Sequence, residues 1–208
     1  QAYENQGLEK GKKGKNENDV NAARDYMCEH YYDVRTFGAV MATGDNPCGI
    51  VRGPVQINFA RSISPVQPLE ITITRQARTT DERKETGDTE MGRKSIIPYG
   101  LYRAEGYVSA SLAQNVTGFS DEDLELLWRA VINMFEDDHS AARGKMCMRK
   151  LYVFKHDTAL GNAPSHKLFD RITITETNSD NPPRSFDDYK ITVDEQNLPD
   201  GVHFESKI

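Results

Sequence analysis

The sequence has only three cysteines and no long hydrophobic run. Cys28, Cys48 and Cys147 are widely spaced and form no C-x-x-C pair, so they predict no zinc site. Buried free thiols in a reducing cytosol explain them better, which predicts a cytoplasmic protein. No segment approaches the roughly 18 apolar residues of a membrane helix. The first fifteen residues are rich in Lys, Gly, Asn and Glu and do not resemble a signal peptide. A membrane is therefore not an expected partner.

The charge of the chain is unevenly distributed. The net charge of −6 over 208 residues argues against indiscriminate binding of polyanions. Residues 34–104 nevertheless carry ten basic against seven acidic residues, and eight of the ten are arginines. Arginine is better suited than lysine to forked contacts with phosphate and to stacking on bases. This distribution predicts one face that binds a polyanion on an otherwise acidic protein.

The hydrophobic pattern predicts a single domain over residues 18–208, preceded by a flexible leader at 1–17. Helical spacing predicts a helix over 18–32, and Ser120 is expected to cap a second helix with Trp128 in its apolar stripe. Period-two alternation predicts strands that begin at Val34 and continue through 51–63, 71–98, 107–114 and 148–156. A hairpin is expected to pair Ile172 and Ile174 with Ile191 and Val193.

Residues 71–98 are predicted to form a projecting hairpin. Ile71 and Ile73 alternate with threonines, but the segment from Thr79 to Glu90 is almost wholly polar and offers nothing to a core. Strand-like residues flank it on both sides, which indicates two limbs and a polar tip. A solvated loop is the alternative for this segment.

Together these elements predict an α+β fold, in which an RRM-like (ferredoxin-like) antiparallel sheet carries an inserted thumb-like hairpin. Sheets of this kind are a recurring platform for RNA. The candidate RNA-binding residues are the arginines, lysines, glycine, amide and aromatic side chain placed on the predicted strands and loops. They are Arg35, Phe37, Gly38, Arg52, Gln56, Arg75, Arg78, Arg93, Lys94, Arg143 and Lys145.

Several motifs carry a resemblance to a known family. The most specific are RTFGAVM at 35–41, VRGPVQ at 51–56 and IPYGLYR at 97–103. Further matches in the same order cover 62–65, 73–75, 118–136, 140–144, 153–156, 160–166, 184–186 and 198–202. Together they resemble the backbone subunit of the type I-C CRISPR Cascade surveillance complex, over roughly residues 18–205.

The resemblance implies a subunit that coats CRISPR RNA and has no catalytic role and no cofactor. Its expected partners are CRISPR RNA, target DNA through the guide, copies of itself and other Cascade subunits. The segment 71–98 would correspond to the thumb, which reaches toward the neighbouring subunit. Family members begin with a further segment that holds the first sheet strand. The sheet is therefore expected to lack that strand, because the segment lies outside this chain or was removed.

Two other functions compete with RNA coating. A metal-dependent RNA endonuclease would need carboxylates that converge on a scissile phosphate, and its loop candidates are Asp45, Asp81, Asp88 and His139. Solvation in an acidic stretch explains Asp81 and Asp88 more simply. A self-assembling scaffold without nucleic acid would leave the excess of arginine in 34–104 unexplained.

Overall fold

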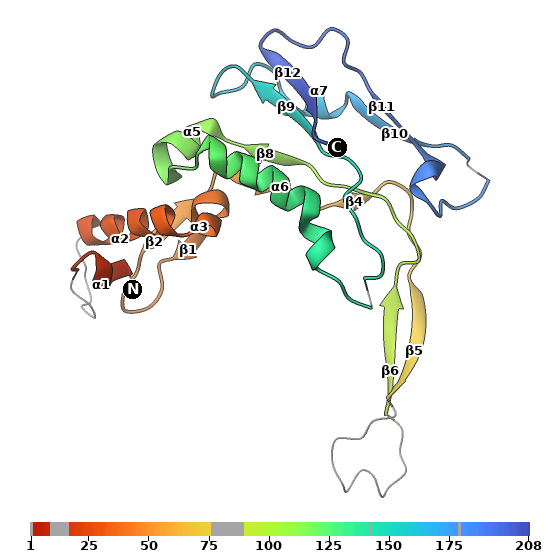
Figure 1. Cartoon of the computed structure of the whole chain (residues 1–208), viewed down its shortest axis with the longest axis horizontal. Helices are drawn as coiled ribbons and strands as arrows, with labels where there is room; N and C mark the ends of the chain where they lie inside the picture. Colours follow the sequence, from red (N-terminus) through yellow and green to blue (C-terminus); the bar gives the residue numbers. More distant parts are fainter. Residues whose placement is uncertain (1, 9–16, 76–89, 142, 179) are drawn as a thin grey trace, which may run out of the picture.

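The chain folds into short helices and short strands in an elongated arrangement (Figure 1). The structure, a computed structural model, describes residues 2–8, 17–75, 90–141, 143–178 and 180–208. The helices are α1 (Ala2–Asn5), α2 (Glu17–His30), α3 (Tyr32–Phe37), α5 (Ala110–Leu112), α6 (Asp121–Asp137) and α7 (Ser165–Phe169), with a π-helix η1 (Ala113–Thr117) and a 3-10 helix η2 (Phe186–Asp188). The strands are β1 (Gly38–Met41), β2 (Gly49–Arg52), β3 (Val55–Ile57), β4 (Arg61–Ser62), β5 (Leu69–Arg75), β6 (Glu90–Ile96), β7 (Tyr102–Arg103), β8 (Gly106–Val108), β9 (Tyr152–His156), β10 (Ile172–Glu176), β11 (Tyr189–Val193) and β12 (Val202–Ser206).

The strands pair two by two. Within the described ranges the pairs are β1–β2, β3–β8, β4–β7, β5–β6, β9–β12 and β10–β11, all antiparallel. The mixture of helices with antiparallel strands confirms the predicted α+β class. The RRM-like topology is not confirmed, because no four-stranded sheet forms among the described residues.

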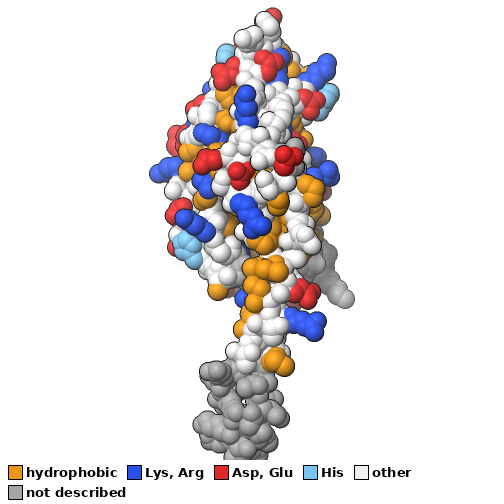
Figure 2. Space-filling model, turned by 90° about the vertical axis from the view of Figure 1, so that its right-hand side faces the viewer, with side chains coloured by type: hydrophobic (Ala, Val, Ile, Leu, Met, Phe, Trp, Pro, Cys, Tyr) orange, Lys and Arg blue, Asp and Glu red, His pale blue; other side chains and the backbone are white. Residues whose placement is uncertain are grey.

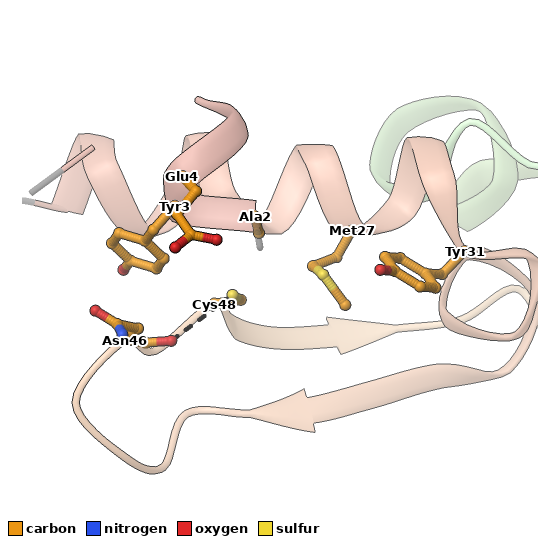
Figure 3. A pocket seen from close by; sticks show the side chains of 7 residues that line it. All are labelled: Ala2, Tyr3, Glu4, Met27, Tyr31, Asn46 and Cys48. Atoms are coloured by element: carbon orange, nitrogen blue, oxygen red, sulfur yellow. Dashed lines mark hydrogen bonds between the residues drawn. The ribbon is translucent and has the colours of Figure 1, made fainter. Parts of the chain in front are cut away.

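The N-terminal part packs around α2. Ala39, Met41 and Val51 lie on the face of β1–β2 that packs with Cys28 and Val34. On another side, Ala2 and Tyr3 of α1 are buried in a cluster with residues of α2 and with Cys48. Leu8 also packs against this cluster, residues 4–7 are exposed, and the flexible leader over 1–17 stays a prediction. Figure 3 shows the hollow that Tyr3 lines together with Met27 and Tyr31.

The segment around residue 35 is helical, so the prediction of a strand beginning at Val34 is wrong. Helix α3 covers Tyr32–Phe37 and buries Val34 and Thr36. β-branched residues favour strands only weakly, and burial against neighbouring elements overrides that preference here. The helix ends at Gly38, whose φ of +81° is readily adopted only by glycine.

Two short strand pairs, β3–β8 and β4–β7, form a narrow ribbon between the N-terminal part and the C-terminal part. Strands β3 and β4 run antiparallel to β8 and β7, where the sequence predicts longer strands over 51–63 and 107–114. The first strand is interrupted at Pro54, which has no amide hydrogen to donate to a ladder. The second ends at Val108, because the Ser109 hydroxyl accepts a hydrogen bond from the Leu112 amide and starts α5.

The helix predicted after Ser120 is present as α6, which lies along this ribbon (Figure 1). Ser120 and Asp123 form a reciprocal capping box at its first turn. Leu127 is buried with Val55 of β3, and Trp128 packs against the same cluster. Trp128 therefore belongs to the core, which confirms the prediction for this helix.

The C-terminal part holds two antiparallel strand pairs. β10 pairs with β11 in the register Ile172↔Val193 and Ile174↔Ile191, as predicted from their alternation. The predicted strand over 148–156 is present as β9 from Tyr152 onward, and β12 pairs with it. Arg103 of the ribbon donates hydrogen bonds to the carbonyls of Phe169 and Ile172 and so holds this part against the ribbon.

The hairpin β5–β6 projects alone from the body (Figure 1). The two strands pair over seven positions, from Leu69↔Ile96 to Arg75↔Glu90. The strands of the expected hairpin over 71–98 are thus present. Its polar tip, Thr79 to Glu90, lies outside the described residues except for Glu90. The division into one domain with an inserted arm stays a prediction.

Candidate nucleic-acid interface

Two glycines bring the backbones of α3–β1 and β2–β3 into direct contact. A Cβ atom at Gly38 would overlap the carbonyl oxygen of Val51, and one at Gly53 would overlap the backbone of Phe37. Neither clash can be relieved by a side chain, because the opposing atoms belong to the backbone. We call this contact the glycine crossing, and it requires glycine at both positions.

Four of the predicted RNA-binding residues lie around the glycine crossing. Gly38 is one of its members and pairs with Arg52 in the β1–β2 register. Phe37 precedes it and exposes 45% of its surface. The Gln56 side-chain amide donates a hydrogen bond of 3.3 Å to the Gly53 carbonyl. The crossing therefore fixes the backbone of the segments that carry the Phe37, Arg52 and Gln56 side chains.

The Arg52 side chain is free to bind an external anion. It is exposed, and it forms no ion pair within the part of the chain that the structure describes. Its position at the end of β2 places it next to Gly53, which is itself buried against the backbone of Phe37 and Gly38. A guanidinium without an internal partner gains most from a phosphate, with which it can form two parallel hydrogen bonds.

The outward face of β1–β2 also carries an apolar pair that the sequence analysis missed. Val40 and Ile50 lie directly opposite each other and are 74% and 64% exposed. By strand alternation they share a face with Arg52, while Ala39 and Val51 point to the core. Alternation along 38–41 and 49–52 could have indicated this face. The sequence, however, predicts a strand from Val34 and does not reveal that β1 begins at Gly38.

Arg35 is engaged inside the molecule. Its Nε and Nη2 donate hydrogen bonds of 2.8 and 2.7 Å to the two carboxylate oxygens of Asp123. The guanidinium also lies over the Tyr32 ring, 5.4 Å from its centroid. Hydrogen bonding from Arg35 lowers the pKa of Asp123, and the same bonds raise the pKa of Arg35. Arg35 thus joins α3 to the first turn of α6, and a phosphate contact by Arg35 stays a prediction.

Two further predicted residues lie on the projecting hairpin. Arg93 and Lys94 of β6 are exposed and make no ion pair among the described residues. As neighbours in a strand they point to opposite faces of the hairpin. The backbone of Arg75 belongs to β5, opposite Glu90, and Arg78 lies outside the described residues. The glycine crossing and the hairpin are therefore separate groups of predicted residues.

The last predicted pair lies in the loop after α6. Arg143 forms an ion pair with Asp138 near the end of α6, and both side chains are about half exposed. Lys145 is exposed and has no ion-pair partner in the described part of the chain. The structure does not bring this loop into the glycine crossing.

The carboxylates proposed for a nuclease do not form a site in the described residues. Asp45 lies in the turn between β1 and β2 and is exposed, as is His139 after α6. Asp81 and Asp88 lie outside the described residues. Within the described ranges, no three His, Cys, Asp or Glu side chains come together in a way that would hold a metal ion.

The comparison with protein families identifies the class of this protein. Residues 1–194 match the family model described as CRISPR-associated protein Cas7. The chain belongs to this family, which implies a CRISPR-associated, RNA-binding backbone subunit. A comparison with curated proteins gave no match. None of the helices in the described ranges has the length and apolar character needed to cross a membrane.

Proposed function

We propose that this chain is a non-catalytic subunit of a type I-C Cascade effector, which oligomerises along CRISPR RNA and leaves the guide bases free to pair with target DNA. The observation that carries the proposal is the glycine crossing with the exposed Arg52 beside it. A free guanidinium and an exposed side-chain amide held by this crossing suit contacts to sugar and phosphate that do not depend on base identity. The type I-C assignment rests on the motifs at 35–41, 51–56 and 97–103.

Self-association is supported by the two faces of the β5–β6 hairpin. Strand alternation places Leu69, Ile71 and Ile73 on one face, and all three are at least 40% exposed. The same face carries Lys94 opposite Ile71, and the other face carries Glu70, Thr72, Arg93 and the exposed Met91. An isolated two-stranded hairpin is marginally stable in water. Figure 2 shows apolar side chains along this arm where it leaves the body. We propose that a neighbouring copy on the RNA covers the apolar face.

The test of RNA binding is the substitution Arg52→Ala. RNA affinity should fall, and the slope of log affinity against log salt should decrease by about one unit, as expected for one lost phosphate contact. Arg129→Ala is the matched control, because Arg129 is an exposed arginine of α6 without an ion pair in the described part of the chain. Arg52→Lys should retain most of the salt slope. If Arg52→Ala binds like the control, the proposed interface is wrong.

The absence of catalysis is part of the proposal and has its own test. The assembled complex is incubated with divalent metal and with RNA complementary to the guide. We expect the complementary RNA to stay intact. Cleavage that Asp45→Ala or Asp88→Ala abolishes would instead support the metal-dependent endonuclease.

A further inference from the structure

A β-bulge interrupts the ribbon at Phe59. Ile57 pairs with Gly106, and the Asn58 amide donates to the Glu105 carbonyl at 2.8 Å. The ladder resumes at Arg61, which pairs with Arg103. Two residues of one strand, Phe59 and Ala60, therefore lie opposite the single residue Ala104. Bulges redirect side chains and are frequent beside functional sites.

The bulge directs the Phe59 ring into solvent. Phe59 is 98% exposed, so the side chain gains nothing from the core. The other aromatic rings with high exposure, Phe37, Tyr102 and Tyr107, are each less than half exposed. An exposed ring contributes little to the stability of the core, so Phe59 is available for a contact outside the fold.

The groups beside the ring are polar and, in sum, basic. Arg61 is exposed and has no ion pair within the described residues. Glu105 lies across the ladder, but its carboxylate is paired with Arg103 at 3.0 Å. Arg103 is in turn held by backbone carbonyls of the C-terminal part. The only guanidinium at the bulge that is available to an external phosphate is therefore that of Arg61, among the residues described.

The bulge continues the segment that carries the glycine crossing. Phe59 follows Gln56 by three positions, a distance of about 10 Å along a strand. The two residues between them, Ile57 and Asn58, are exposed. A nucleic acid strand held at Arg52 and Gln56 can therefore reach the ring without leaving this surface.

We propose that Phe59 is a stacking platform for a nucleobase of the bound RNA strand, and that Arg61 contacts the adjoining phosphate. Aromatic side chains next to a free guanidinium are the common means of holding unpaired bases, and stacking tolerates every base. This inference rests on the proposed function and adds a base contact to an interface otherwise made with the backbone. The competing occupant of the ring is a second copy of the chain.

The direct test introduces a fluorescent ring with Phe59→Trp. The sequence has one native tryptophan, Trp128, whose signal forms a constant background. Titration with a uridine homopolymer should quench the introduced indole. Leu160→Trp is the matched control, because Leu160 is 99% exposed and lies in a turn after β9, away from the ribbon. The control should show no more quenching than the wild-type protein, and equal quenching in both variants would overturn the proposal.

A second pair of variants separates stacking from an apolar protein contact. Phe59→Leu keeps the apolar character but removes the π face, and Phe59→Ala removes both. If a base stacks on the ring, both variants should lose about 5- to 100-fold in RNA affinity. Thermal melting should be unchanged in both, because the ring contacts no core. Wild-type affinity in Phe59→Leu, with loss only in Phe59→Ala, would identify the second copy as the occupant.

The outcomes also distinguish this inference from the proposed function. RNA binding that depends on Arg52 but is unaffected by Phe59→Leu and Phe59→Ala would overturn the stacking platform alone. A wild-type protein that binds no RNA under any salt condition would overturn both.

Discussion

At the scale of single residues, the arginines concentrated in residues 34–104 take different roles. Arg52 faces outward without a partner, whereas Arg35 makes a two-pronged ion pair with Asp123. Arg103 binds backbone carbonyls of the C-terminal part. The sequence shows only that arginines are concentrated in 34–104. It cannot show which of them pair internally, because the partners are up to 88 residues away.

The Arg35–Asp123 pair makes the stability of the protein depend on pH. The substitution Asp123→Asn should destabilise the protein by about 1.5–3 kcal/mol, since a largely buried guanidinium loses a charged acceptor. The pKa of Asp123 is lowered in the folded protein, so its contribution is complete above the ordinary value of 3.8 and is lost as pH falls through the folded pKa. Thermal melting from pH 7 to pH 2.5 measures this.

The control for this prediction is Asp121→Asn. Asp121 is an exposed acid of the same first turn and makes no ion pair in the described part of the chain. The difference in melting temperature between wild type and Asp123→Asn should be constant at neutral pH and should shrink below pH 3.8. A difference that persists undiminished at pH 2.5, or an equal cost for Asp121→Asn, would contradict the assignment.

At the scale of elements, local signals predict those helices and strands whose structure depends on local interactions. Ser120 and the apolar stripe after it define α6, and alternation defines the β10–β11 pair. Prediction from the sequence fails where contacts with residues distant in the chain decide the local structure. Val34 and Thr36 are strand-favouring residues that are buried in α3. The glycine crossing joins Gly38 to Gly53, and no local pattern announces such a contact. The sequence therefore predicts which residues belong to the candidate site around Arg52. It does not predict that the glycine crossing brings their segments together.

The β5–β6 hairpin is the element on which assembly should depend. The double substitution Ile71→Thr with Ile73→Thr keeps β-branched strand formers but reduces the apolar face. Melting of the free protein should change little, because both side chains are about 40–45% exposed. Cooperative assembly on long RNA should weaken by roughly fivefold or more, as for the loss of interface anchors. Sedimentation on long and short RNA measures the cooperativity.

The hairpin's other face supplies the control for this experiment. Thr72→Ser with Thr74→Ser changes two residues at the same spacing on the opposite face. These substitutions should leave assembly as in the wild type. Unaltered cooperativity in the Ile71→Thr, Ile73→Thr variant would show that a neighbouring copy does not cover the apolar face.

At the scale of the whole molecule, an acidic protein with a basic segment should bind RNA without selecting its sequence. Contacts from a guanidinium, from a side-chain amide held to phosphate or sugar and from a stacked ring do not read base identity. Guides of equal length with scrambled sequences should therefore bind with affinities within about twofold, and every affinity should fall as salt rises. Competition binding at two salt concentrations tests this. A difference of tenfold or more between scrambled guides would show direct base readout.

The Arg35–Asp123 pair also has a consequence for the order of events during synthesis. Its two residues are separated by 88 positions along the chain. A ribosome adds about 5–20 residues per second, so Arg35 is translated roughly 4–18 s before Asp123. During that interval Arg35 has no carboxylate of α6 to hold, and the contacts between α3 and α6 are absent. The N-terminal part of the protein can therefore reach its final packing only after the ribosome has translated α6.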